Sequence, residues 1–457
     1  MRFVDSRHVV VVGLGDTGLA TVRWLLAHGA RVTVADSRED PPRYPALERD
    51  FPSVSCRFGA FTEQTFADAE LLVVSPGVPL SLPAITDFIR HKGEVLGDIE
   101  LFARAIADIG SKVIAITGSN GKSTVTTLVG HLCQEAGLRT IVAGNIGLPV
   151  LEALLTCETE HCFPDVWVLE LSSFQLEATT SLNADASVVL NISEDHLDRY
   201  NDLLDYAHSK TSIFNGHGVQ VLNHDDPLVR AMARTGRQIR WFSLRSSNVD
   251  YGLQVRDNQY WLTIDTVPVF EFCHMPLHGL HNAANVLAAL ALVDVIGINR
   301  TNVLDSLITF RGLPHRVEFV DEIHHVTYID DSKGTNVGAT VAALTGMASP
   351  VVLIAGGEGK QQDFRPLYDA CLNKVRAVVL IGRDAPLIDR ALDKLMVPRV
   401  YCETLEQATH KAATLAQAGD TVLLSPACAS YDMFVDYKHR SRVFVAAVQQ
   451  IKAGALA

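Results

Sequence analysis

Short apolar runs alternate with helical stretches along the whole of this 457-residue chain. Runs rich in Val, Ile, Leu and Ala occupy residues 8–12, 31–35, 71–74, 113–117, 140–143, 166–171, 187–192, 326–329, 351–355, 377–381 and 421–424. Continuous runs of this kind are typical of strands buried on both faces of a parallel sheet. Their alternation with helices predicts an α/β fold.

One stretch has a different pattern. Residues 239–272 alternate polar and apolar side chains and are rich in Trp and Tyr, which favours antiparallel strands at the flank of a parallel sheet. At roughly 150 residues per domain, the length predicts about three domains. We place them at residues 1–110, 111–312 and 313–457.

Charge and composition exclude several classes of protein. The chain has 39 Lys and Arg against 52 Asp and Glu residues, a formal net charge of -13, and 48% hydrophobic residues. This composition excludes a disordered chain, a disulfide miniprotein and a coiled coil. It argues against a nucleic-acid binder, which needs a basic surface. Small anionic substrates remain compatible with it, because a few local donors can hold them.

The cysteines and the apolar runs bear on the compartment. The eight cysteines form no CxxC pair, so we expect reduced thiols. No signal-peptide pattern precedes the first apolar run, and no apolar run approaches the roughly 20 residues of a membrane span. We therefore expect a cytoplasmic protein without a membrane span.

A glycine-rich turn follows the first predicted strand. Residues 13–18 read Gly-Leu-Gly-Asp-Thr-Gly, precede a helix, and are followed by Asp36 at the end of the next strand. This is the Rossmann fingerprint in its expected context, with a helix N-terminus that favours an anion. The motif alone leaves three interpretations open: NAD binding with Asp36 on a ribose, binding of another nucleotide, or a tight turn that binds nothing.

A second glycine-rich run predicts a polyphosphate cradle. Residues 117–124 read Thr-Gly-Ser-Asn-Gly-Lys-Ser-Thr and lie between a predicted strand and a predicted helix. Lys122 can reach the terminal phosphates, and the Ser123 hydroxyl can bind Mg²⁺. Ile116 stands where the standard motif has Gly, so this is a shortened variant. A hydride-transfer enzyme has no use for such a cradle, whereas an ATP-driven enzyme could hold a nucleotide-linked substrate at the first turn.

Two further strands end in candidate ligands. Glu170 terminates a buried strand, and His196 follows the next one within an acidic run. Ligands of open α/β sheets collect at the carboxyl ends of strands, so Glu170 is a candidate Mg²⁺ ligand and His196 a candidate metal or phosphate contact. Lys210 taken alone would be an ordinary solvated lysine.

The chain resembles the Mur ligases of peptidoglycan synthesis over essentially its whole length. The resemblance rests on the cradle, on Glu-Leu-Ser-Ser-Phe-Gln at residues 170–175 and on Asp-His-Leu-Asp at residues 195–198. Further motifs carry it at residues 143–147, 279–282, 313–316, 331–336, 356–360 and 425–430. Ser119 and Gly334 are mild departures from the family pattern. The cradle alone would also fit folylpolyglutamate synthases.

The resemblance implies a three-domain ligase. Its N-terminal domain would be Rossmann-like and hold the UDP of a sugar substrate. Its central domain would be the P-loop ATPase, with a parallel sheet and flanking antiparallel strands, and its Rossmann-like C-terminal domain would hold the amino acid. The implied reaction is ATP-dependent addition of D-glutamate to UDP-N-acetylmuramoyl-L-alanine through an acyl phosphate and a tetrahedral intermediate. We expect a monomer that binds these substrates and two Mg²⁺ ions.

The resemblance also assigns residues. For ATP they are Gly118, Ser119, Asn120, Gly121, Lys122, Ser123, Thr124, Asn282, Arg316, Asp331 and Lys333. For the UDP-sugar they are Asp16, Thr17, Ser37, Arg38, Ser75, Asn145 and His196. The metal ligands would be Ser123, Glu170, His196 and Lys210 as its carbamate, and the catalytic residues Lys122, Glu170, His196 and Lys210. D-Glutamate brings two carboxylates, so its pocket needs donors; the candidates are Thr335, Lys360 and Ser430, with Tyr437 packing nearby.

Three other functions compete with this one. Another Mur ligase or a ligase like folylpolyglutamate synthase would differ in its amino acid or acceptor. An NAD-dependent oxidoreductase would leave the ATP cradle unexplained. A non-catalytic nucleotide-binding protein would bind ATP but release no phosphate.

Overall fold

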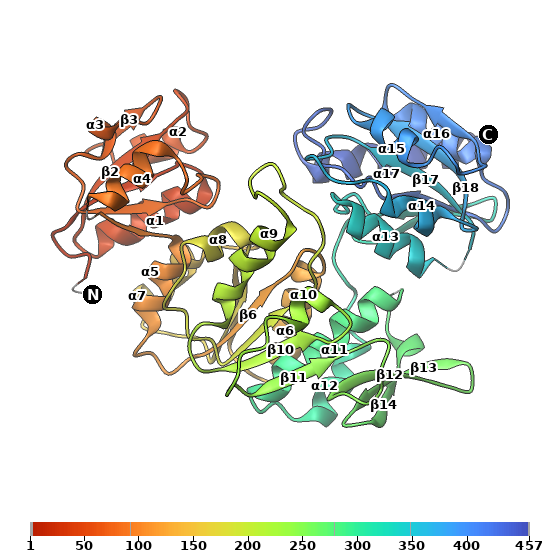
Figure 1. The fold of residues 1–457 in the computed structure, drawn as a ribbon, viewed down its shortest axis with the longest axis horizontal. Coiled ribbons are helices and arrows are strands. Elements are labelled where there is room, and N and C mark those ends of the chain that lie inside the picture. Colours follow the sequence, from red (N-terminus) through yellow and green to blue (C-terminus); the bar gives the residue numbers. More distant parts are fainter. Residues whose placement is uncertain (1–2, 92, 278, 348, 456–457) are drawn as a thin grey trace.

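The fold has three sheets in series. A computed structural model describes residues 3–91, 93–277, 279–347 and 349–455. Its strands form one five-stranded, one nine-stranded and one six-stranded sheet, mostly parallel and flanked by helices (Figure 1). The α/β prediction is confirmed. None of the helices in these ranges is both long and apolar enough to cross a membrane.

The N-terminal sheet is entirely parallel. Its order is β3-β2-β1-β4-β5, with β1 and β4 at the centre, where every residue from Val9 to Val12 and from Leu71 to Val74 is buried. Its strands are β1 (His8–Val12), β2 (Arg31–Asp36), β3 (Ser55–Phe58), β4 (Leu71–Val74) and β5 (Glu94–Leu96). Its helices are α1 (Asp16–Ala27), α2 (Tyr44–Asp50), α3 (Glu63–Phe66) and α4 (Pro83–Arg90), and α5 (Asp98–Ile106) follows β5.

The central sheet joins a parallel part to an antiparallel flank. Its order is β14-β13-β12-β11-β10-β9-β6-β8-β7. Its strands are β6 (Lys112–Thr117), β7 (Thr140–Gly144), β8 (Val166–Glu170), β9 (Ala186–Val189), β10 (Val219–Asn223), β11 (Ile239–Phe242), β12 (Tyr251–Arg256), β13 (Gln259–Ile264) and β14 (Val267–Glu271). Among the strands described in this sheet, β13 is antiparallel to both of its neighbours, β12 and β14, and the other pairs are parallel.

One part of the antiparallel prediction is wrong. Strand β11 runs parallel to β10 and is only partly buried, with Arg240 exposed. Its polar–apolar alternation therefore reflects one poorly covered face near the end of the parallel part, because alternation reports burial rather than strand direction. The helices of the central part are α6 (Lys122–Glu135), α7 (Val150–Glu160), α8 (Ser173–Glu177), α9 (Leu203–Lys210), α10 (Pro227–Arg230), α11 (Leu280–Val295) and α12 (Arg300–Leu307). Two 3₁₀ helices, η1 (Thr211–Phe214) and η2 (Phe272–His274), follow α9 and β14.

The C-terminal sheet has the order β15-β16-β20-β17-β18-β19 and is parallel except for β15 at its edge. Its strands are β15 (Glu318–Ile323), β16 (Val326–Asp330), β17 (Val351–Gly356), β18 (Val375–Ile381), β19 (Arg399–Tyr401) and β20 (Thr421–Leu424). Its helices are α13 (Val337–Gly346), α14 (Pro366–Cys371), α15 (Ala385–Ala391), α16 (Leu405–Leu415) and α17 (Tyr437–Ala455).

The hydrophobic cores are not divided equally among the three sheets. One cluster of buried side chains contains residues of both the N-terminal and the central parts, among them Trp24, Phe102 and Trp167. Helix α5 contributes to it, and the Phe102 and Trp167 rings meet edge to face at 5.0 Å. The two clusters of the C-terminal part contain no buried residue from the other parts. The domain division at residues 110/111 and 312/313 stays a prediction; both points lie between one sheet and the next.

The two outer parts lie on either side of the central part (Figure 1). The yellow-green segment that precedes α9 rises between them. Hydrogen bonds from this segment reach both outer parts, as described below.

Candidate active site

The phosphate cradle is built by close backbone packing. Strand β6 ends at Thr117, the loop of residues 118–121 follows, and α6 begins at Lys122. Gly118 has φ 151° and Gly121 has φ 85°, both in the region that favours glycine. A Cβ on Gly118 would lie 2.9 Å from the Cβ of Leu190, and one on Gly121 would collide with the Asn285 side chain. Glycine is therefore required at both positions.

Lys122 lies inside the cradle. Its Nζ donates to the carbonyl oxygens of Gly118 and Ser119, at 2.8 and 2.9 Å. Burial lowers the pKa of Lys122, and the charges of Glu170 and Asp195 oppose that shift. An ammonium at the N-terminus of α6 gives the loop a second attraction for phosphate besides the helix dipole.

Glu170 ends strand β8, which pairs with β6 so that Ile116 lies beside Glu170. The side chain is buried, and its Oε1 accepts a hydrogen bond of 2.8 Å from Asn145 Nδ2. Its Oε2 is buried without a hydrogen-bond partner. Such an oxygen is costly unless a cation compensates it, so Glu170 fits the chemistry of a metal ligand.

Lys210 is buried at the end of α9, 1% exposed. Its Nζ donates to Thr117 Oγ1 at 3.4 Å and lies 4.6 Å from the centre of the Tyr206 ring. Burial, helped by the positive charge of Lys122, holds the pKa of Lys210 well below its ordinary value. Burial beside the cradle therefore favours the neutral amine of Lys210, which is its nucleophilic form.

Asp195 joins the central part to the C-terminal part. Its carboxylate accepts hydrogen bonds from Lys360 Nζ at 3.1 Å and from Asn336 Nδ2 at 3.2 Å. The adjacent His196 has φ 55° and packs edge to face on Phe174, with ring centres 4.8 Å apart. Burial lowers the pKa of His196 to about 4, so its imidazole is neutral at pH 7.

Lys333 brings a second cation from the C-terminal part to the cradle. Its Nζ donates to Ser123 Oγ at 3.0 Å and lies 5.5 Å from the centre of the Tyr437 ring. Burial, helped by the charge of Arg316, lowers the pKa of Lys333 to about 8. The Ser123 hydroxyl, which is predicted to bind Mg²⁺, therefore accepts a hydrogen bond from the Lys333 ammonium in this structure.

A cavity of about 330 Å³ lies between the central and C-terminal parts beside the cradle. Arg316 lines it, and the Nε of this residue is buried without a hydrogen-bond partner. Asp331 also lines it; burial raises the pKa of Asp331 to about 7, against the opposing effects of Ser425 and Arg316. The cavity has an apolar wall and a few buried polar groups, which suits a nucleoside.

A larger cavity of about 1070 Å³ lies between the N-terminal and central parts. It is lined by the first glycine-rich turn, by the loops after β2 and β4, and by the loop after β7. Asp36 accepts from the Leu14 N–H at 2.7 Å and from the Arg38 side chain at 2.7 and 2.8 Å, and is 2% exposed. Its carboxylate is thus engaged within the protein, which argues against the ribose contact of the NAD interpretation.

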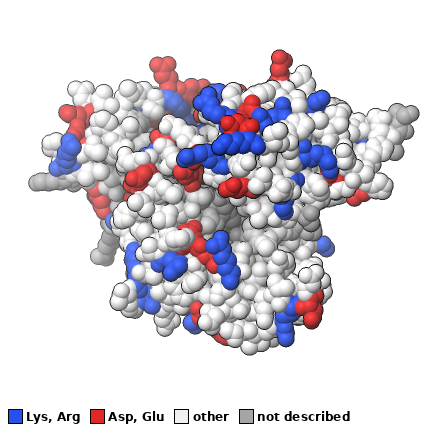
Figure 2. Space-filling view, turned by 45° about the vertical axis from the view of Figure 1, so that its right-hand side comes forward, with Lys and Arg blue, Asp and Glu red and all other residues white. Residues whose placement is uncertain are grey.

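Charged side chains are mixed on the surface. On the face drawn in Figure 2, Lys and Arg side chains are interspersed with Asp and Glu, rather than gathered into a patch of one sign. This face therefore has no broad area of positive charge that would attract anions.

Three family models match consecutive parts of the chain. They are described as Mur ligase MurD-like, N-terminal domain, over residues 7–97; Mur ligase middle domain, over residues 116–293; and Mur ligase, glutamate ligase domain, over residues 315–428. The chain belongs to the Mur ligase family. The resemblance seen in the sequence is confirmed.

Curated relatives match over nearly the full length. A UDP-N-acetylmuramoylalanine--D-glutamate ligase of Chromobacterium violaceum is 63% identical over 448 residues, 98% of each chain. One of Thiobacillus denitrificans is 51% identical over 464 residues, again 98% of each. Among solved structures, MurF from Acinetobacter baumannii has a TM-score of 0.62 at 17% identity, covering 98% of this chain and 92% of its own. MurC from Thermotoga maritima has 0.59 at 19%, covering 97% and 99%.

Most residues predicted for nucleotides in this Mur ligase line the two cavities. The smaller cavity is lined by Asn120, Gly121, Thr124, Asn282, Arg316 and Asp331. The remaining predicted ATP residues, Gly118, Ser119, Lys122 and Ser123, belong to the cradle or the start of α6, and Lys333 contacts Ser123. The larger cavity is lined by Asp16, Thr17, Ser37, Arg38, Ser75 and Asn145, whereas His196 lines neither.

The four residues predicted for D-glutamate come from neighbouring loops and the start of α17. Thr335 follows β16, Lys360 follows β17 and Ser430 follows β20, three strands adjacent in the sheet. Gly334 O accepts from Ala427 N and Glu358 exchanges two backbone hydrogen bonds with Ala429, which ties the three loops together. Tyr437 begins α17, and its carbonyl accepts from Ser332 Oγ at 2.8 Å.

The sequence-based site missed the contacts that join the parts of this Mur ligase. Arg199 donates to the Pro76 carbonyl of the N-terminal part at 2.9 Å and to Glu177 at 2.7 Å, and stacks 4.0 Å over Phe174. Asn336 reaches Asp195 from the C-terminal part. No sequence pattern pairs residues so distant. The only signal was that Arg199 follows the Asp-His-Leu-Asp motif directly.

Proposed function

We propose that this Mur ligase is an ATP-dependent carbon–nitrogen ligase that adds D-glutamate to UDP-N-acetylmuramoyl-L-alanine in peptidoglycan precursor synthesis. The activities after which its full-length relatives are named, at 63% and 51% identity, support this choice of substrates. The observation that carries the chemistry is the gathering of Lys122, Glu170 and Lys210 around one cradle. Glu170 and Lys210 are buried there and Lys122 is partly buried, and each interacts with the charges of the others.

The donor set fits Mg²⁺. Glu170 has a buried carboxylate oxygen without a partner, and Ser123 offers a hydroxyl at the start of α6. His196 offers a neutral imidazole as a further ligand, and its side chain is about one-third exposed. When bound, the ions would neutralise charge on the triphosphate and polarise the γ-phosphoryl group. Two ions are part of the proposal.

Lys210 fits a carbamate. Its lowered pKa favours the neutral amine, which is the form that attacks carbon dioxide to give an anionic carbamate. An ammonium beside a metal is repulsive, whereas a carbamate oxygen is a metal ligand. The modification would turn a costly buried lysine into an anion.

The first chemical step would activate a carboxylate. The alanyl carboxylate oxygen attacks the γ-phosphorus, and the bond from that phosphorus to the oxygen that bridges it to the β-phosphorus breaks. The products of this step are the acyl phosphate and ADP, which is the leaving group. Lys122, at the N-terminus of α6, would offset the charge of the migrating group. The role of the protein here is mostly to hold the two substrates in line.

The second step would form the amide. The D-glutamate α-amine attacks the acyl carbon to give a tetrahedral intermediate, which expels phosphate as the amine loses a proton. Lys360 and the Thr335 and Ser430 loops would hold the two carboxylates of D-glutamate, with Tyr437 beside them. These groups come from three neighbouring strand ends, where ligands of α/β sheets collect.

The UDP-sugar would occupy the larger cavity, and ATP the smaller one. The distribution of the predicted residues supports this arrangement, because six from each set line the respective cavity. Each of the three predicted domains then binds one substrate. A cytoplasmic monomer completes the proposal, since UDP-linked precursors and ATP are intracellular substrates.

A phosphate-release assay tests the function. The chain is incubated with ATP, Mg²⁺ and UDP-N-acetylmuramoyl-L-alanine, and D-glutamate is compared with L-glutamate, L-alanine and L-lysine. Release that depends on both the UDP-sugar and D-glutamate is the expected result. Phosphate release with another amino acid instead of D-glutamate would indicate a different Mur ligase activity. ATP binding without phosphate release would contradict the proposal that the protein is a ligase.

A further inference from the structure

Helix α7 ends in a backbone motif that brings two cysteines together. His161, just beyond the helix, has φ 52°. The Cys162 N–H donates to the Cys157 carbonyl at 3.0 Å, and the His161 N–H to the Glu158 carbonyl at 3.4 Å. This pair of bonds around a left-handed residue is a Schellman motif. In such a motif the side chains at the positions of Cys157 and Cys162 commonly contact each other.

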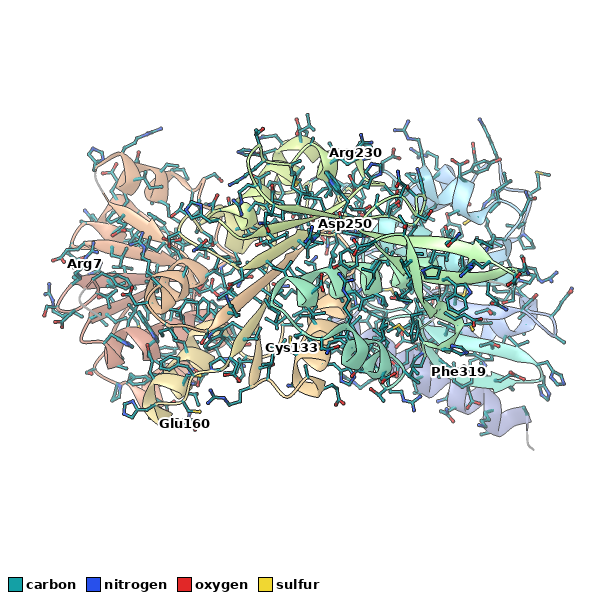
Figure 3. The ribbon with its side chains drawn as sticks, turned by 90° about the horizontal axis from the view of Figure 1, so that it is seen from below. Arg7, Cys133, Glu160, Arg230, Asp250 and Phe319 are labelled. Carbon is teal, nitrogen blue, oxygen red and sulfur yellow. The ribbon has the colours of Figure 1, made fainter. Side chains whose placement is uncertain are left out.

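The motif holds the Cα atoms of the two cysteines close to the range that a disulfide spans. Standard bond lengths, with the 3.0 Å hydrogen bond between their backbones, limit the Cα–Cα separation to at most about 7 Å. Disulfides span Cα separations of roughly 4.4–6.8 Å. Both thiols are free in the structure. A disulfide here would close a loop of only a few residues at the end of α7, where Figure 3 marks Glu160 on the rim of the molecule.

The two thiols have different surroundings. Cys162 is exposed, and the Arg139 guanidinium lies 3.4 Å from its sulfur, held in place by hydrogen bonds to Asp165. A nearby guanidinium stabilises a thiolate, the reactive form. Cys157 is 4% exposed, and burial, followed by the charges of Cys162 and of two glutamates in α7, raises the pKa of Cys157.

We propose that Cys157 and Cys162 are a reversible redox pair, in which Cys162 reacts first with a hydroperoxide and Cys157 then closes a disulfide. In the first step the Cys162 thiolate attacks one peroxide oxygen. A sulfur–oxygen bond forms, the oxygen–oxygen bond breaks, and hydroxide leaves. In the second step the Cys157 sulfur attacks the Cys162 sulfenic acid; the disulfide forms, the proton of Cys157 joins the departing hydroxyl, and water leaves. A dithiol reductant restores both thiols.

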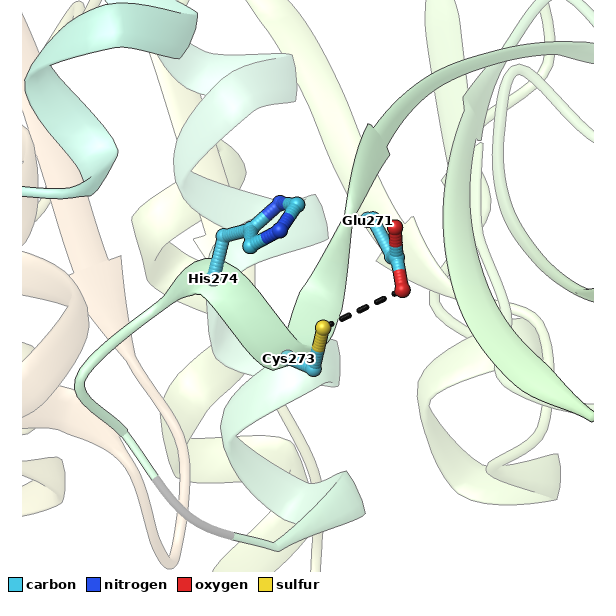
Figure 4. A group of neighbouring side chains, drawn as sticks. All are labelled: Glu271, Cys273 and His274. Carbon is cyan, nitrogen blue, oxygen red and sulfur yellow. Dashed lines mark hydrogen bonds between the residues drawn. The ribbon is translucent and has the colours of Figure 1, made fainter.

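The chain supplies a matched control in Cys273. It is also exposed, but its sulfur donates a hydrogen bond of 3.1 Å to Glu271, as Figure 4 shows. That hydrogen bond, with a small contribution from burial and the charge of Glu271, raises the pKa of Cys273. Cys162 and Cys273 thus have similar access to solvent and opposite electrostatic surroundings.

The disulfide can be detected on the intact wild-type chain. The protein is treated with hydrogen peroxide, blocked with an alkylating reagent, and cut by a protease specific for glutamate. Glu158 and Glu160 lie between the two cysteines. Cleavage there leaves the two fragments joined if the disulfide is present and separate after dithiothreitol. We expect the joined fragment, 2 Da lighter than the sum of the two thiol peptides, and its disappearance on reduction.

Two variants test whether Cys162 is oxidised before Cys157 closes the disulfide. In Cys157→Ser, dimedone should trap a sulfenic acid on Cys162; in Cys162→Ser, Cys157 should stay a thiol. Before oxidation, iodoacetamide at pH 7 should modify Cys162, beside the Arg139 guanidinium, on the order of tenfold faster than Cys273, beside the Glu271 carboxylate. No joined fragment from the peroxide-treated wild type, or oxidation of Cys157 in the absence of Cys162, would overturn the proposal. So would equal alkylation rates for Cys162 and Cys273.

Discussion

Lys360 and Asp195 form a partly buried ion pair of 3.1 Å between the C-terminal and central parts of this Mur ligase. Burial alone would raise the pKa of Asp195, but the charge of Lys360, followed by those of His196 and Lys122, holds it below its usual value. The Asp195 carboxylate is therefore ionised at neutral pH. An incoming dicarboxylate would compete with Asp195 for the same ammonium.

Replacement of Lys360 tests its role with D-glutamate. Lys360→Ala removes the ammonium and should raise KM for D-glutamate at least about tenfold, with much less effect on KM for ATP. Steady-state phosphate release measures both constants. Lys394→Ala, at an exposed lysine of the same part, is the control and should change neither. Equal effects of Lys360→Ala on both substrates would contradict the assignment.

The Lys210 carbamate makes a second prediction. Lys210→Ala should abolish amide formation, because the metal site would lose an anionic ligand. Depletion of bicarbonate should inhibit the wild type reversibly. Mass spectrometry under non-acidic conditions should find 44 Da on Lys210, the mass of one carbon dioxide. Lys112→Ala, at an exposed lysine that pairs with Asp185, should remain active. Full activity of Lys210→Ala would rule the carbamate out.

A third prediction follows from the unpartnered carboxylate oxygen of Glu170. Glu170→Gln keeps an acceptor for Asn145 but removes the negative charge. Phosphate release should fall on the order of a hundredfold, and the Mg²⁺ concentration for half-maximal activity should rise. Titration of activity with Mg²⁺ measures both effects. The exposed Glu135 at the end of α6 supplies the control variant Glu135→Gln. Unchanged Mg²⁺ dependence in Glu170→Gln would remove Glu170 from the metal ligands.

Arg199 should act as a positioning residue for the UDP-sugar. It ties the Pro76 carbonyl, in the loop that lines the larger cavity, to Glu177 and Phe174. Arg199→Ala should therefore raise KM for the UDP-sugar several-fold and leave KM for D-glutamate unchanged. Arg57→Ala breaks a pair with Asp68 away from the cavity and is the matched control. A loss of kcat alone, with both KM values unchanged, would speak against positioning.

Asp98 predicts a pH dependence of stability. Burial raises the pKa of Asp98 to about 6, against the opposing hydrogen bond from Gln175. The folded state then binds more protons than the unfolded state between pH 4 and 6. The contribution of Asp98 to the free energy of unfolding therefore falls as pH rises through this window and is lost above it. Asp98→Asn should remove about 1 kcal/mol of the difference between pH 5 and pH 7. Urea denaturation at both pH values measures it; an unaltered difference would contradict a raised pKa.

The sequence predicted buried strands well and edges poorly. Strands β1, β4 and β20 were predicted at their observed bounds, because a strand covered on both faces needs an unbroken apolar run. Strand β15 was missed, since this exposed edge strand carries Glu318, Asp321 and Glu322. Strand β5 has only three residues, too few to form a pattern.

Motifs predicted the residues of the candidate site better than their partners. The cradle could be recognised because its glycines meet a backbone requirement that is written locally in the sequence. The burial of Lys210 against Thr117, 93 residues away in the chain, depends on how α9 packs. The same holds for the contacts of Lys333 with Ser123 and of Arg199 with Pro76, which form only once whole domains meet.

The shared hydrophobic cluster of the N-terminal and central parts makes the molecule mechanically asymmetric. Pulling those two parts away from each other would break a core that contains Trp24, Phe102 and Trp167. The C-terminal part keeps its own clusters and contacts the central part through hydrogen bonds from Lys333 to Ser123 and from Asn336 and Lys360 to Asp195. Its departure would leave every core intact. A nucleotide bound in the smaller cavity would therefore leave on the side where no shared core has to break.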